Sequence, residues 1–241
     1  MAKALIEDAK KLVELSSDYS PLLSHLIRYN TDPPRTRDEA RDILKSILGL
    51  SDSLSEPCLR ASPVGWYSSC AGPVDIFNHE SRSFDRVSQT PAVCFTNSTL
   101  GGLSAHRDVF KAQYGLAFGR DFLYEQGANP CLDIRSDLFK KDLRRKEDLY
   151  SRKLYNFLPK QLLPFVNIIN QDFDATHERE WRIARDFKFQ HSDVRYVFCP
   201  ESDFALFSIV QTEGIPVLLD LDQLPAGPTP SPSTDVRRQH I

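Results

Sequence analysis

Long apolar stretches are missing from this sequence, and no uninterrupted run approaches the roughly 20 residues that a membrane-spanning helix needs. The segment at residues 1–17 alternates charged and apolar side chains, so it also lacks the apolar centre of a secretion signal. These two features predict a cytoplasmic protein that does not bind a membrane.

An excess of positive charge is missing as well. Thirty Lys and Arg stand against 33 Asp and Glu among the 241 residues, which gives a net charge of −3. A chain with this balance has no general basic field to hold nucleic acid, so any such contact must be local. The length suits one compact domain with additional segments better than two full domains.

The sequence also lacks common phosphate-binding and zinc-binding motifs. Neither G-x-G-x-x-G nor G-x-x-x-x-G-K-[ST] occurs, which argues against a Rossmann or P-loop domain. The five cysteines form no C-x-x-C pair, and three of them lie in apolar stretches. We therefore expect reduced, packed thiols and no metal site.

Helix and strand patterns alternate along most of the chain. Helical spacing predicts a helix within residues 1–20, and the short apolar run at 21–29 predicts a strand. Thr36 and Glu39 have the spacing of a capping box before a second helix. Residues 51–90, rich in Ser, Pro, Gly and Asn, predict a long surface-loop insertion. Further strands are expected at 92–96, 114–118, 130–134, 179–184, 194–199 and 215–220.

The stretch at 135–153 is basic, with eight Lys or Arg against four Asp or Glu. It predicts a helical insertion over about 135–170, whose charged face is either solvated and lined with i to i+4 pairs or in contact with a phosphate backbone. The proline-rich residues 225–241 are expected to be disordered. Together the patterns predict an α+β fold in which a single domain spans 21–224.

The densest group of ionisable side chains is HEREWR at 177–182, where a predicted strand begins. Glu178 and Glu180 share one strand face, and paired carboxylates can raise each other's pKa and serve proton transfer or stabilise a cation. The alternative is a charged edge strand with Trp181 alone in the core. His25, inside an apolar strand, is either a core histidine with satisfied hydrogen bonds or a ligand contact. Arg28 would face the opposite side from His25 on a regular strand.

Several blocks resemble the AbiGi family of bacterial abortive-infection proteins, which act in phage defence. They cover most of residues 19–205 in the family's order and read YSPLLSHLIR, ILKSILGL, AVCFTNSTLGGL, KAQYGLAFGRDFLYEQGANPCLDI, EREWRIARDF and VRYVFCPESDF. This family looks like a distant branch of the ADP-ribosyltransferase superfamily. The resemblance therefore implies an ADP-ribosyltransferase-like split β-sheet with flanking helices, which binds NAD as a substrate and needs no metal.

The resemblance also implies roles for individual residues. His25 matches the first-strand residue that hydrogen-bonds the nicotinamide ribose, and Tyr114, or else Phe118, matches the aromatic that stacks on nicotinamide. Glu180 matches the glutamate that holds the ribose 2′-hydroxyl. Its charge would stabilise the oxocarbenium-like state in which the bond to nicotinamide breaks. The His25 imidazole and the Glu180 carboxylate must then converge on one dinucleotide.

The function implied is an NAD-dependent ADP-ribosyltransferase that acts as a toxin in phage defence, with a co-encoded antitoxin or chaperone-like partner. Arg28 and Arg120 are candidate pyrophosphate contacts by charge alone. RNA is expected as the acceptor ahead of DNA, because the basic segment and the loop aromatics Trp66 and Tyr67 combine charge with stacking surfaces. A protein acceptor is the other possibility.

Two further function classes stay open. One is a non-catalytic antitoxin or binding module that neutralises a partner toxin, and such a protein would be harmless when expressed alone. The other is a metal-dependent nuclease built on Asp172, Asp174, Glu178 and Glu180, although Arg182 stands where that motif has lysine.

Overall fold

The structure, a computed structural model, describes residues 20–29, 33–51, 55–64, 74–78, 81–87, 89–139, 159–169, 176 and 179–224. It is a mixed α and β structure with one large sheet and short helices, in agreement with the predicted α+β class. In the described part of the chain, no helix is long and apolar enough to cross a membrane.

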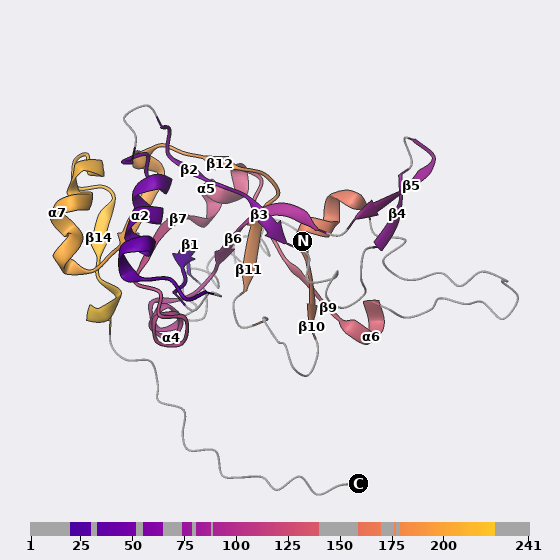
Figure 1. Ribbon diagram of the computed structural model, residues 1–241, viewed down its shortest axis with the longest axis horizontal. Coiled ribbons are helices and arrows are strands. Elements are labelled where there is room, and N and C mark those ends of the chain that lie inside the picture. Colours follow the sequence, from indigo (N-terminus) through magenta and orange to yellow (C-terminus); the bar gives the residue numbers. More distant parts are fainter. Residues whose placement is uncertain are drawn as a thin grey trace, which may run out of the picture.

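A mixed eight-stranded sheet organises the molecule (Figure 1). Seven strands follow the order β14-β13-β7-β1-β6-β11-β8, and β3 pairs with β6 beside that path. Within this sheet only the pair of β13 and β14 is parallel, and the other described pairs are antiparallel. The strands are β1 (Leu22–Ile27), β3 (Ser62–Val64), β6 (Thr90–Thr96), β7 (Tyr114–Gly119), β8 (Asn129–Pro130), β11 (Glu180–Ile183), β13 (Val194–Phe198) and β14 (Val217–Leu219).

Three two-stranded sheets accompany the large one. They are β9 (Leu132–Arg135) with β10 (Val166–Ile169), β2 (Cys58–Leu59) with β12 (Phe187–Lys188), and β4 (Val74–Asn78) with β5 (Ser83–Val87). Because β2 to β5 lie inside 51–90, the prediction of a surface loop there is wrong in the described residues. The helical insertion expected up to about residue 170 is likewise wrong at its end, where β10 follows a 3-10 helix, η2 (Lys160–Phe165).

Five short α-helices and further 3-10 turns connect the strands. They are α2 (Arg37–Ile47), α4 (Leu100–Phe110), α5 (Arg120–Glu125), α6 (Ser136–Phe139), α7 (Phe204–Phe207), η4 (His191–Asp193), η5 (Glu201–Asp203), η6 (Ser208–Val210) and η7 (Leu221–Gln223) in the described residues. The capping box predicted for α2 is confirmed. The Thr36 hydroxyl accepts from the Glu39 amide at 3.2 Å, and the Glu39 carboxylate accepts from the Thr36 amide at 2.7 Å.

The two faces of the sheet differ in composition because side chains alternate along each strand. Leu23 and Ile27 of β1 belong to a large core that includes buried side chains of α2 and α5. Leu22 and Leu26 pack instead with a smaller cluster around Leu103 of α4. We call the face that carries the large core the aromatic face, and the face that carries the Leu103 cluster the α4 face.

Several expected features lie outside the described residues. These are the N-terminal helix up to residue 19, Trp66 and Tyr67, the basic segment beyond residue 139, and the tail at 225–241. Four of the five cysteines are described, and all four are free thiols as expected, two of them buried.

Gly115 on β7 lies so close to the His25 carbonyl oxygen that a Cβ atom at this position would clash with it. Gly115→Ala must push β7 away from β1, and we expect it to lower the free energy of unfolding by about 1–3 kcal/mol. Gly101→Ala is the matched control, since a Cβ there would approach only Thr99 Oγ1, at 4.0 Å. Urea unfolding measures both, and equal losses of stability would contradict the close approach of the two strands.

Candidate functional site

His25 projects from β1 into the aromatic face. Its Nδ1 atom lies 2.9 Å from the Cys94 carbonyl oxygen, and its ring meets Phe95 edge-on with centroids 6.1 Å apart. Burial lowers the pKa of the imidazole, so the ring is neutral near pH 7. Because a carbonyl oxygen only accepts, Nδ1 carries the proton. His25 is thus a half-buried histidine whose Nδ1 hydrogen bond is satisfied by the backbone.

Tyr114 and Phe118 of β7 are completely buried on the same face. The Tyr114 hydroxyl donates to the Asp203 carboxylate and accepts from Arg37 Nε at 3.3 Å. Burial and the Asp203 carboxylate raise the pKa of Tyr114 to about 12, so the hydroxyl keeps its proton. Phe118 packs edge-on against Phe95 and other core rings. Neither ring presents a face on which a ligand could stack in this conformation.

Glu180 is held by a buried guanidinium on its own strand. Arg182, with 0% of its surface exposed, donates from Nε to Glu180 Oε1 at 3.0 Å and from Nη2 to Oε2 at 2.8 Å. Asn167 of β10 donates a third hydrogen bond to Oε2 at 3.0 Å. Burial raises the pKa of Glu180, but the Arg182 charge and these hydrogen bonds outweigh it and lower the pKa. The carboxylate is ionised and fully engaged.

The strand register places His25 and Glu180 on opposite faces of the sheet. Thr96 of β6 pairs with Ser24 on one side and with Glu180 on the other, so these three side chains share the α4 face. His25 lies one residue on from Ser24 and faces Phe95 instead. The convergence of imidazole and carboxylate that the resemblance implied is therefore not found.

The two candidate pyrophosphate contacts do not form one site either. The Arg28 guanidinium lies over the ring of Phe110 at the end of α4, 4.2 Å from its centroid. Arg120 is the first residue of α5, and the Arg120 Nε atom lies 3.8 Å from Asp121 Oδ1. Leu123 of the same helix packs into the aromatic face. The helices next to these two arginines cover opposite faces of the sheet.

Sequence reasoning missed a group of hydroxyls on the α4 face. Beside Ser24, the Thr96 and Ser98 hydroxyl oxygens lie 2.7 Å apart, and Ser98 Oγ lies 3.3 Å from His106 Nε2. Ser24 and Ser98 line a cavity of about 430 Å³. The signal was present in SPLLSH and FTNST, where small polar residues interrupt apolar strands, but which face they share depends on pairing between distant strands.

The nuclease alternative stays a prediction, because Asp172, Asp174 and Glu178 lie outside the described residues. Within the described residues, no group of three or more His, Cys, Asp or Glu side chains is arranged to hold a metal ion. The remaining member, Glu180, already has its carboxylate oxygens bonded to Arg182 and Asn167.

Comparison of the chain with protein-family models, with curated proteins and with solved structures gives no match.

Replacing Glu180 removes the only carboxylate that is paired with buried Arg182 in the described residues. We expect Glu180→Gln to lower the free energy of unfolding by about 3–5 kcal/mol, because it leaves a buried charge uncompensated. Glu56→Gln, which breaks an exposed pair with Lys188, is the control and should change stability little.

The contribution of Glu180 to the free energy of unfolding depends on pH with a definite sign. Since the pKa of Glu180 is lowered by folding, its contribution is fully present above the ordinary glutamate pKa of about 4.3 and is lost as the pH falls through the folded-state value. Glu180→Gln should remove that part of the acid-induced loss of stability. Denaturant titrations from pH 7 to pH 3 measure it, and parallel curves for the two proteins would contradict the ion pair.

Proposed function

We propose that this chain is a non-catalytic binding module of the antitoxin type that neutralises a co-encoded toxin. The observation that carries the proposal is the separation of His25 from Glu180 by the sheet. In addition, Tyr114 is closed into the core and Glu180 is held by Arg182. A catalytic carboxylate for ribose chemistry needs a free oxygen directed at the substrate, and both oxygens of Glu180 are engaged.

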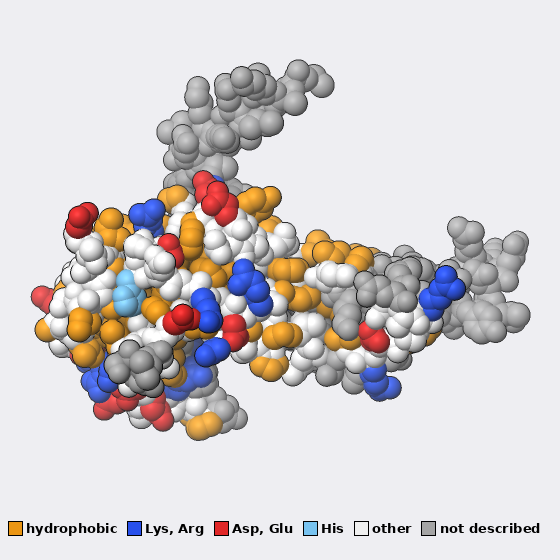
Figure 2. All heavy atoms as spheres, turned by 90° about the horizontal axis from the view of Figure 1, so that it is seen from above, with side chains coloured by type: hydrophobic (Ala, Val, Ile, Leu, Met, Phe, Trp, Pro, Cys, Tyr) orange, Lys and Arg blue, Asp and Glu red, His pale blue; other side chains and the backbone are white. Residues whose placement is uncertain are grey.

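An apolar surface at one end of the sheet supports a binding role. Leu206, Ile209, Ile215 and Val217 are exposed large hydrophobic side chains, and Ile209 is 75% exposed. They come from α7, η6 and the segment around β14, the edge strand of the large sheet. Figure 2 shows hydrophobic side chains reaching the surface between charged ones at that end of the molecule. Exposed apolar side chains next to a strand edge that is unpaired in the described residues favour contact with another protein.

The enzyme implied by the family resemblance is the second candidate. What favours it is the order of polar groups across the sheet: the predicted histidine on β1, hydroxyl groups at the end of the neighbouring β6, and the predicted glutamate on β11 next to β6. In that case the fold would be the ADP-ribosyltransferase-like split sheet. NAD would be the substrate, and RNA, DNA or a protein the acceptor. Activity would require Glu180 to leave Arg182 and His25 to leave its contacts with Cys94 and Phe95.

Expression and NAD consumption separate the two functions. For a binding module we expect unchanged growth when the chain is expressed alone, and rescue of growth when it is expressed with the co-encoded toxin. We also expect no consumption of labelled NAD and no transfer of label to total RNA, DNA or lysate protein. Growth arrest together with label transfer by the wild-type protein would overturn the proposal and establish the enzyme.

The apolar end can be tested on the complex itself. Ile209→Asp should weaken the complex with the co-encoded toxin at least tenfold, because it places a charge in the proposed contact. Val109→Asp, at an α4 position that is 65% exposed, is the matched control and should bind like the wild type. Both proteins should keep the wild-type melting temperature. Equal affinities measured by calorimetry would exclude this surface as the binding site.

A further inference from the structure

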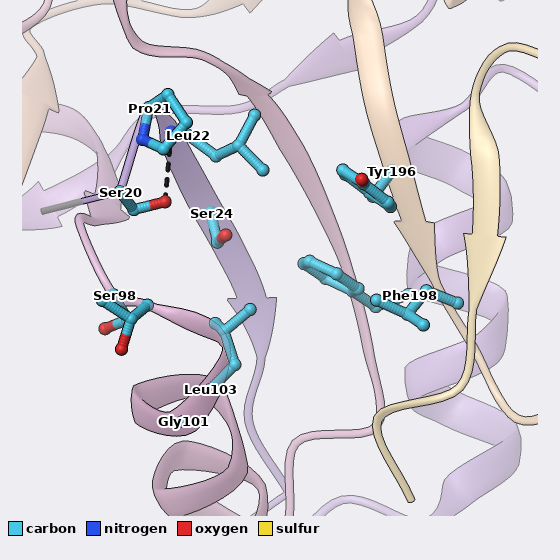
Figure 3. A pocket seen from close by; sticks show the side chains of 11 residues that line it. Ser20, Pro21, Leu22, Ser24, Ser98, Gly101, Leu103, Tyr196 and Phe198 are labelled. Atoms are coloured by element: carbon cyan, nitrogen blue, oxygen red, sulfur yellow. Dashed lines mark hydrogen bonds between the residues drawn. The ribbon is translucent and has the colours of Figure 1, made fainter. Parts of the chain in front are cut away.

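The cavity on the α4 face has two unlike walls (Figure 3). One wall carries the hydroxyls of Ser20, Ser24 and Ser98. The facing wall carries the rings of Tyr196 and Phe198 from β13, which are nearly parallel, at 9°, with centroids 6.4 Å apart. Its volume of about 430 Å³ is in the range of small-molecule sites.

Ser24 is the residue that points to a ligand. It is 98% buried, since only 2% of its surface is exposed, and it lines the cavity. The hydroxyls of Ser20 and Ser98 have hydrogen-bond partners, but the Ser24 hydroxyl has none in the described part of the chain. The Ser24 hydroxyl oxygen is not among the fully buried unpartnered atoms of the described residues, so it is accessible from the cavity, where water or a ligand can bond to it.

The first turn of α4 adds a second donor at the same cavity. The Thr99 side chain and carbonyl oxygens accept from the Gly102 and Leu103 amides, respectively. The Gly101 amide has no acceptor among the described residues, and Gly101 lines the cavity. First-turn amides of an 11-residue helix favour an anionic group. Among the described residues, no acidic side chain lines the cavity to oppose one.

We propose that this cavity binds a small molecule in which a carboxylate is attached to an aromatic ring. The carboxylate accepts from the Ser24 hydroxyl and the Gly101 amide. The ring lies against Tyr196 and Phe198, where apolar contact and ring packing hold it. The cavity lies on the sheet face opposite His25, and its wall includes Leu219 of β14, two residues from Val217 of the apolar end. The inference rests on Ser24 and Gly101, so it is independent of the proposed binding function.

Titration of the full chain with sodium benzoate tests the proposal. With ¹⁵N-labelled protein we expect the Gly101 amide to move downfield and the amides of Tyr196 and Phe198 to shift, with saturation in the millimolar range. Ser24→Ala should raise the dissociation constant about tenfold, because it removes a hydrogen bond to a charged group. Ser208→Ala, an exposed serine on η6, is the control and should bind like the wild type.

Each outcome of this titration is decisive. A saturable shift of the Gly101 amide, with weaker benzoate binding in Ser24→Ala, would support the site. If the variant does not fold, the saturable Gly101 shift in the wild type still tests the proposal. The absence of saturable shifts up to 20 mM benzoate would overturn it. Equal or tighter binding of benzamide, which has the same ring without the charge, would overturn the assignment of a carboxylate.

Discussion

The structure depends on the burial of one guanidinium. Arg182 has five N–H donors, and all of them are used: Nε and Nη2 bond to Glu180, Nη2 also bonds to Asn167, and Nη1 bonds to the carbonyl oxygens of Pro164 and Val166. A buried charge is tolerated only with such complete pairing. The same contacts hold η2 and the start of β10 against β11, and they occupy the Glu180 carboxylate, to which the family resemblance gave the catalytic role.

The two faces of the sheet differ in packing: one is closed, and the other carries a cavity. The aromatic face is closed by α2, α5 and packed rings, so Tyr114 is part of the core and His25 is half-buried against Phe95. The α4 face carries Glu180, the hydroxyls around Thr96, and a cavity that is open beside Ser24. Structural and ligand-facing polar groups therefore lie next to each other along single strands, one residue apart.

Local patterns were sufficient for the elements that local chemistry determines. The capping box of Thr36 and Glu39 and the strands with compact apolar runs, including β1, β6 and β7, were predictable. The short strands at 58–87 were not, because two to five residues interrupted by Pro, Ser and Asn carry too little alternation to distinguish a strand from a loop. The direction in which Glu180 points was also beyond local reasoning. It depends on the register with Thr96 and follows Arg179, which has a left-handed backbone at φ 44°.

The position of β1 has a consequence for synthesis. It is the earliest described strand in the sequence, yet it lies between β6 and β7. In addition, the Tyr114 hydroxyl bonds to both Arg37 and Asp203, which are 166 residues apart in the sequence. Contacts this distant in sequence slow folding, since a long loop must close before any of them forms. A ribosome must have released the chain through β7, to residue 119, before this central strand gains both neighbours. Until then β1 presents two bare edges to the quality-control machinery of the cell.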